Sequence, residues 1–456
     1  MKTRIYLSLV LLPALICLGC ADRETALLKR MNDSVAAIPI IDSHEHLGPE
    51  SSRIGRNIGL MSLLPTWEQD QMRENLVGLN PGNGPGRLPS DIDEQWKLAA
   101  PYFERIHNTA GQKVLIRACR DLFGIDDFSA ETYRDVMEAF NRANRPGRYD
   151  EVLRGKAGIE LIIADVWNWT GEDIPPYDPT LFRNVVRLDD FIFKQYWRDW
   201  EVWKSIDNVQ ERTGIQIKNL TDWERALEIA FLDSKKRGFV AIKTAIAYMR
   251  TLGFDHVERR DAAAAFGRML KYRGVKGRPL PPDRKLLEDY CFGLIADGCV
   301  RHGLPLQIHT GLFADNRRDI RNSNPANLIP FIIRHRETRF VLMHSGYPYG
   351  GELLAMAKTL PNVNIDMCWT YLISPTYGAR LLDEAIETVP ADKLIAFGGD
   401  SGLPEIAYGH AVIARETLAK VLADKVIDGY WSETEALEYA RAVLHDNAIK
   451  IFNLKL

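Results

Sequence analysis

Six side chains that can take part in metal chemistry follow short apolar segments of this 456-residue chain. The segments are IIDSHEHL, VAIKTA, LQIHTG, VLMHSG and AFGGDS, and the side chains are His44, His46, Lys243, His309, His344 and Asp400. Imidazole and carboxylate groups are common ligands of divalent metals. If the segments are parallel strands that end on one face, these residues predict a metal site that can activate water.

His44 and His46 are separated by one residue, so on a strand their side chains point to the same face. An HxH pair alone is a weak signal, and its place at the end of an apolar run strengthens it. Asp42 precedes the pair on the same face, where we expect it to orient a ligand imidazole.

His309 and His344 each end an apolar run and are each followed by a small residue and a glycine. A single histidine at such a place is more often a hydrogen-bonded core residue, but two in matching places favour ligands. Asp400 lies in Asp-Ser-Gly, which by itself is typical of a turn or a helix N-cap. Beside four histidines, we expect it to bind metal and to accept a proton from water.

Lys243 leaves three alternatives open. An ammonium group does not ligate a metal, but carbamylation would convert it into a carboxylate that bridges two ions. It could instead bind an anionic substrate, or form a structural salt bridge.

The elements that must position these residues alternate between strand and helix patterns from residue 38 onward. Most predicted strands are continuous apolar runs, as in a parallel sheet covered by helices. The eight predicted strands span 38–46, 158–166, 184–191, 239–245, 304–309, 339–344, 362–367 and 393–398. This pattern predicts a (β/α)8 TIM-like barrel over residues 38–456.

Two segments exceed a minimal barrel. Residues 47–157 form an insertion after the first strand, with helices expected near 92–108 and 130–143. Residues 250–280 follow the fourth strand. Because both come after the C-terminal end of a strand, we expect both over the active-site face. The amphipathic segment Glu433–Leu454 predicts one final helix packed on the barrel.

Residues 1–20 are typical of an export signal, because Lys2 and Arg4 precede an apolar run too short to span a bilayer comfortably. The following LICLGC resembles the lipobox of bacterial lipoproteins and predicts a lipid on Cys20. We therefore expect a periplasmic or outer-membrane-anchored protein; a plain secretory signal or a retained anchor are the alternatives. Residues 21–37 would form a tether or helix.

Charge and cysteine content limit the partners. The formal net charge of −3 argues against a nucleic-acid-binding surface, which needs a basic excess. Outside the signal, the four cysteines show no zinc-finger spacing and are expected to be buried: Cys119, Cys291, Cys299 and Cys368. A small-molecule substrate is the expected partner, and a homo-oligomer remains open.

The order of HxH, Lys, His, His and Asp resembles the amidohydrolase superfamily. The segments GFVAIKTAIAYMRTLGF, LPLQIHTG, LMHSGYP, NVNIDM and DNAIKIFNL are most similar to its amidohydrolase-2 branch, in particular to FluG-like and nodulin-like members. The resemblance spans roughly residues 35–455. It implies one or two zinc-like ions that activate water, with Asp400 as the proton shuttle.

The resulting hypothesis is a metal-dependent hydrolase that cuts an amide, ester or lactone bond of a small carboxyl-bearing substrate. Asp400 would take the proton from water and pass it to the leaving group. His344 would either bind metal or polarise the scissile carbonyl. Zinc fits the ligand types, though manganese and iron fit them as well.

Substrate contacts are predicted for four residues near strand ends. Arg187 could hold an anion, with a structural ion pair to Asp189 or Asp190 as the alternative. Tyr248 and Arg250 follow Lys243, in a place where the resemblance implies an aromatic–arginine pair, although Met249 intervenes here. Trp167 would contribute to an aromatic wall, together with Trp169 and Trp369; core packing is the alternative.

Two other function classes remain. The first is a lyase or isomerase on the same site, such as a decarboxylase or a uronate-isomerase-like enzyme. Uronate isomerases usually carry an arginine two residues after the final aspartate, where this chain has Gly402. The second is a non-catalytic surface lipoprotein, against which the presence of all six site residues argues.

Overall fold

The computed structural model describes residues 23–65, 68–69, 71–72, 89–166, 168–171, 176–193, 202–271 and 283–455. The predicted export signal in residues 1–20 and Trp167 lie outside the described residues. Among the helices in those ranges, none has the length and apolar character needed to cross a bilayer.

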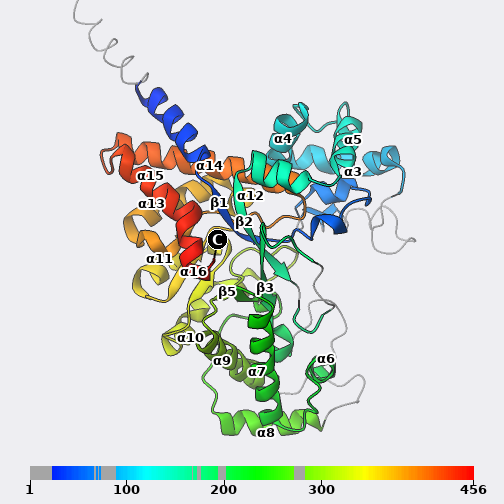
Figure 1. Cartoon of the computed structure of the whole chain (residues 1–456), viewed down its shortest axis with the longest axis vertical. Helices are drawn as coiled ribbons and strands as arrows, with labels where there is room; N and C mark the ends of the chain where they lie inside the picture. Colours follow the sequence, from blue (N-terminus) through cyan, green and yellow to red (C-terminus); the bar gives the residue numbers. More distant parts are fainter. Residues whose placement is uncertain are drawn as a thin grey trace, which may run out of the picture.

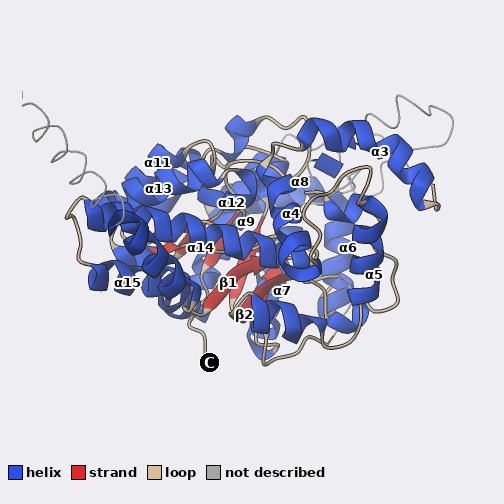
Figure 2. Cartoon of the chain, turned by 90° about the horizontal axis from the view of Figure 1, so that it is seen from above, coloured by secondary structure: helices blue, strands red, loops and turns tan. Residues whose placement is uncertain are grey.

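Eight parallel strands in sequential order form the centre of the molecule, which confirms the predicted TIM barrel. Figure 2 shows these strands surrounded by helices. The strands are β1 (Ile40–Glu45), β2 (Ile159–Val166), β3 (Phe182–Arg187), β4 (Ala241–Thr244), β5 (Leu306–Ile308), β6 (Phe340–Leu342), β7 (Val363–Asp366) and β8 (Leu394–Ile395). Backbone bonds from Ser43 to Phe397 and from Asp400 to His44 close the barrel between β8 and β1.

The barrel interior is filled by apolar side chains from alternate positions of the strands, as expected for strands buried on both faces. These side chains form one cluster with the C-terminal residues Ile451 and Phe452, which cover the N-terminal end of the barrel. The opposite end, where the strands finish, is therefore left for the predicted chemistry.

Helices form the outer layer around the strands. They are α6 (Val202–Thr213), α7 (Leu220–Lys236), α8 (Arg259–Leu270), α9 (Arg284–His302), α10 (Ile329–Arg334), α11 (Gly350–Thr359), α12 (Thr370–Ile373), α13 (Pro375–Thr388) and α14 (Pro404–Ile427). Proline begins both α13 and α14, where its missing N–H costs no helical hydrogen bond.

The insertion after β1 forms a helical layer with its own core. It contains α3 (Ile92–Ile106), α4 (Ala110–Phe123), α5 (Tyr133–Ala143) and the π-helix Asp150–Lys156. Figure 1 shows α3, α4 and α5 together on one side of the barrel. The apolar side chains of these helices join Met343, Cys368 and Trp369 at the strand ends, and α4 packs on α14. The insertion thus covers the mouth of the barrel.

The second extra segment differs from expectation. Its helix α8 packs on the outside of the barrel against α7 and α9, and none of its side chains lines the cavity at the strand ends. Apolar contacts decide this placement, because Phe266 packs against Trp223 and Phe193. Residues 272–280 lie outside the described residues.

Both ends of the described chain pack on the barrel. Residues 23–36 form a helix that buries Leu27, Met31 and Val35, and Arg30 pairs with Glu433. The single helix expected at the C-terminus is instead α15 (Glu433–Arg441), a π-helix (Ala442–Asp446) and α16 (Asn447–Phe452). The interruption has a cause: the carbonyl of Val443 accepts the Ala396 N–H, which draws it out of regular helical bonding.

Candidate metal centre and active site

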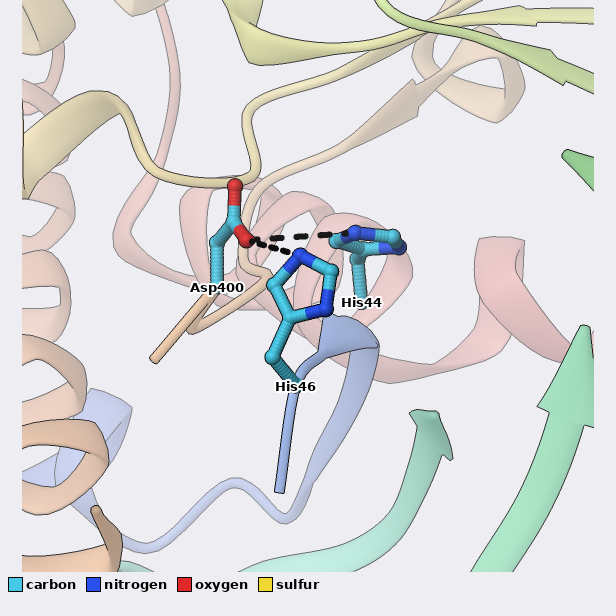
Figure 3. A group of neighbouring side chains, drawn as sticks. All are labelled: His44, His46 and Asp400. Atoms are coloured by element: carbon cyan, nitrogen blue, oxygen red, sulfur yellow. Dashed lines mark ion pairs between the residues drawn. The ribbon is translucent and has the colours of Figure 1, made fainter. Parts of the chain in front are cut away.

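His44, His46 and Asp400 converge where β1 and the segment after β8 meet (Figure 3). The Oδ1 atom of Asp400 lies 3.0 Å from Nε2 of His46 and 3.9 Å from Nε2 of His44. One ligand atom from each residue falls within 4.8 Å of the others, which is close enough for one ion to bind all three.

The backbone after β6, β7 and β8 adopts strained conformations at the site. His344, Trp369 and Asp400 have φ values of 63°, 69° and 49°, in the left-handed region that residues other than glycine rarely adopt. Such strain is typical of functional sites, where the surrounding structure enforces it. Here all three strained residues have side chains that line the cavity at the strand ends.

Gly399 lets the end of β8 approach β1. A Cβ atom at this position would lie 1.8 Å from Oε1 of Glu45. The Gly399 N–H donates to Asp42 and the Ser401 N–H donates to Glu45, so these two buried carboxylates hold the segment on both sides of Asp400. Asp42 also accepts from the His44 N–H, and so it orients backbone, not the ligand imidazole that we expected.

The protonation states of the cluster suit metal binding. Burial lowers the pKa of His44 well below its usual value, and the charge of Lys243 lowers it further. Burial by itself would raise the pKa of Asp400, but His46 and His344 hold it far below its usual value. Neutral imidazole and an ionised carboxylate are the forms that bind metal. The donor set therefore fits a divalent cation such as zinc.

His344 and His309 lie beside this cluster. Nδ1 of His344 is 3.7 Å from Asp400, and the His309 and His344 ring centres are 4.3 Å apart. The Nε2–H of His309 donates to the carbonyl of Leu312, which leaves the Nδ1 lone pair for a ligand. Burial lowers the pKa of His344 to about 4.

A second set of potential ligands consists of His344, Cys368 and Asp400. The sequence predicted Cys368 only as a buried cysteine. It is buried and free, as are Cys119, Cys291 and Cys299, and burial raises the pKa of the Cys368 thiol well above its usual value.

Lys243 lies between His44 and Asp165. Its Nζ is 3.3 Å from Nε2 of His44 and 3.5 Å from Oδ2 of Asp165. Burial lowers the pKa of Lys243, and the charge of Asp165 partly offsets this effect. Arg187 donates through both Nε and Nη2 to the same carboxylate. Of the three alternatives for Lys243, the structure shows directly the salt bridge, which is formed with Asp165.

Asp165 is a functional-site residue that our sequence analysis missed. It lies on β2, one residue before the end of the strand, which is the position used to select the other site residues. Its partner is Arg187, for which the sequence analysis considered Asp189 or Asp190 but not Asp165. The Asp165, Arg187 and Lys243 side chains come together because β2, β3 and β4 are neighbouring strands of the sheet.

The predicted substrate contacts divide into two groups. Arg187 and Tyr248 line the cavity, and Trp369 forms part of its wall. Arg250 does not line it, because Glu288 and Asp289 bind its guanidinium and Phe254 lies beneath it. Trp169 is buried elsewhere and donates to Asp233. Arg318, which no motif marked, lines the cavity on the loop after β5.

The whole arrangement borders a cavity of about 770 Å³ at the strand ends. This volume suits a small molecule. The insertion contributes Met61, Leu63 and Leu64 to the walls, so it covers the active-site face as predicted.

Residues 233–454 match the family model described as Amidohydrolase. The chain also shares 30% identity over 223 residues with the protein FluG of Emericella nidulans, a match that covers 47% of this chain and 26% of FluG. The matched part of the chain belongs to the amidohydrolase superfamily, in its amidohydrolase-2 branch. This membership supports an enzyme and agrees with the metal-ligand geometry at the strand ends.

Uronate isomerases resemble this chain over nearly its whole length. The enzyme of Nostoc punctiforme is 22% identical over 486 residues, covering 96% of this chain and 97% of the relative. The crystal structure of the Thermotoga maritima uronate isomerase matches with a TM-score of 0.73 at 18% identity, covering 94% of this chain and 97% of that one. The structural match shows a shared fold.

Proposed function

We propose that this protein is a metal-dependent hydrolase that cleaves an amide, ester or lactone bond of a small carboxylate. The observation that carries the proposal is the convergence of His44, His46 and Asp400 beneath a cavity of small-molecule size. A divalent cation bound there, with zinc as our choice, supplies Lewis acidity that acidifies water and polarises a carbonyl.

The residues of the chain have separate roles in this proposal. His44 and His46 hold the cation, and His344 or His309 completes its ligands. Asp400 stays ionised below neutral pH, so it can accept a proton from the attacking water and return it to the leaving group. Lys243 and Arg187, balanced by Asp165, make the cavity floor electropositive and favour an anionic substrate.

Isomerisation of a uronate is the second candidate, favoured by the match to uronate isomerases along nearly the full chain. Gly402 argues against it. This glycine lines the cavity, and a Cβ there would meet nothing within 4 Å. The space where uronate isomerases usually place an arginine is therefore open here.

The deciding experiment is product analysis by mass spectrometry. The zinc-loaded mature chain would be incubated with N-acyl amino acids, lactones and hexuronates. Hydrolysis adds the elements of water to the substrate, isomerisation leaves its mass unchanged, and decarboxylation releases carbon dioxide. We expect only hydrolytic products; conversion of a hexuronate at constant mass would replace the proposal with the isomerase.

The export of the protein remains part of the proposal. If Cys20 carries a lipid, the described helix at residues 23–36 begins only a few residues later and would place the barrel close to a membrane surface. Metabolic labelling with a radioactive fatty acid, compared between wild type and Cys20→Ser, tests this location.

A further inference from the structure

The cavity over the metal-binding residues has two unlike sides. Strand order separates them, because β3, β4 and β5 lie opposite β7 and β8 in the barrel. The ends of β3 to β5 contribute mostly polar and charged groups, whereas the ends of β7 and β8, together with the insertion, contribute mostly apolar ones; the polar exceptions there are Ser62, Gln69 and Ser401. His44, His46 and Asp400 lie between the two sides, at β1 and after β8.

The apolar side is continuous with the core of the insertion. Its six side chains belong to the same cluster, and each is at most 8% exposed. They are Leu63, Leu64, Trp369, Leu372, Leu403 and Ile406. Met61 lies half-buried beside them. Such a wall offers a ligand contact area but few hydrogen bonds.

The polar side carries three cationic groups: Arg187, Lys243 and Arg318. Arg318 donates through Nε and Nη2 to Asp315, which also lines the cavity, and through Nη1 to the carbonyl of Tyr248. Its guanidinium lies 5.9 Å from the centre of the Tyr248 ring, which also lines the cavity. The three cations outnumber the two carboxylates that bind them, Asp165 and Asp315, so this side keeps a positive excess that favours a carboxylate.

We infer that the substrate is a carboxylate with an apolar arm, such as an aryl or branched alkyl group. The carboxylate faces Arg318 and the β3–β5 side, and the arm lies against Trp369, Leu403 and the insertion. This inference rests on the proposed function and narrows its substrate class. A polyhydroxylated acid would instead leave hydroxyl groups against the apolar wall without partners, which is unfavourable.

The test compares the affinities of three carboxylate probes for the zinc-loaded full chain by isothermal titration calorimetry. The probes are 4-phenylbutyrate, butyrate and D-glucuronate. We expect 4-phenylbutyrate to bind at least about tenfold more tightly than either of the others, because only its ring buries apolar surface on the wall. Equal or weaker binding of 4-phenylbutyrate, or absence of binding, would overturn the inference.

A substitution at Met61 tests where the apolar arm of the substrate binds. Met61→Ser should weaken 4-phenylbutyrate severalfold and leave butyrate unchanged, with the thermal midpoint recorded to show that the variant folds. The matched control is Leu232→Ser, since Leu232 is 55% exposed on α7 and does not line the cavity. An equal loss for both probes in Met61→Ser would contradict the assigned wall.

The outcomes separate this inference from the proposed function. Preferential binding of the aryl probe without hydrolysis of any N-acyl amino acid or lactone would support the substrate class and defeat the hydrolase. Hydrolysis restricted to polar substrates, with no preference for the aryl probe, would support the hydrolase and contradict the substrate class.

Discussion

The ammonium of Lys243 lies 3.5 Å from the carboxylate of Asp165, beside His44 of the proposed metal site. Arg187 donates to the same carboxylate, so one buried anion faces two buried cations. Burial by itself would raise the pKa of Asp165, but Arg187 and Lys243 hold it below its usual value. The electrostatics of the cavity floor therefore depend on Asp165.

Replacing Asp165 with asparagine should destabilise the metal-free protein by about 3–5 kcal/mol, because two buried cations lose their counter-charge. Urea unfolding measures the change. Asp93→Asn is the control, since Asp93 forms an exposed ion pair with Arg134 on the surface of the insertion. Equal effects of the two substitutions would show that the buried carboxylate has no special role.

Asp400→Asn should lower turnover by about 10²–10⁴-fold, because the amide cannot accept the proton of the attacking water. Once a hydrolysed substrate is known, steady-state kinetics give the value. Asp428→Asn serves as the control, because Asp428 lies at the end of α14, away from the cavity. Full turnover in Asp400→Asn would remove this residue from the proton transfer.

Arg318 and Arg250 form a matched pair, since carboxylates bind both guanidinium groups but only Arg318 lines the cavity. Arg318→Gln should raise KM about tenfold with little effect on kcat, as expected when a substrate carboxylate loses a charged partner. Arg250→Gln should leave KM unchanged and lower the thermal midpoint. The opposite pattern would restore Arg250 as the substrate-binding arginine.

His410 predicts a pH dependence of stability. It is buried behind the site, and its Nδ1–H donates to the carbonyl of Gly399. Burial lowers the pKa of His410 from 6.5 to about 4. Because the folded pKa lies below the unfolded one, its stabilisation is complete above pH 6.5 and is lost as the pH falls toward 4.

For the metal-free protein, His410 should therefore account for a loss of roughly 2–3 kcal/mol between pH 7 and pH 4.5. Other buried histidines shift in the same direction, so the comparison with His410→Gln isolates this residue. Urea midpoints at the two pH values should differ less in the variant. Identical differences in wild type and variant would mean that His410 can be protonated in the fold without cost.

The fold and the convergence of the candidate site residues were predictable because both follow from local patterns. Each strand is an apolar run, and parallel strands must end on one face, which is why His44, His309, His344 and Asp400 could be grouped. Asp165 could have been found by the same rule. The role of Asp165 could not be predicted, because it depends on Arg187 and Lys243 on neighbouring strands. The register of the sheet sets this pairing.

Arg250 is the reverse case, because the sequence analysis selected it and the structure places it outside the lining of the cavity. The motif suggested a substrate contact, but the 3-10 turn Ile246–Tyr248 and the intervening Met249 direct the chain toward α9, where Glu288 and Asp289 bind the guanidinium. Likewise, the second extra segment lies outside the barrel because Phe266 packs on Trp223. Such long-range contacts are not encoded in the spacing of a single segment.

The most direct test of the central claim is the metal content of the gently purified mature chain, measured by elemental analysis in wild type and in His44→Asn/His46→Asn. Wild type should hold about one or two divalent ions per chain, and the double variant should hold almost none, because two of the three converging ligands are lost. A wild type that binds no metal, even after incubation with zinc, manganese or iron, would contradict the account.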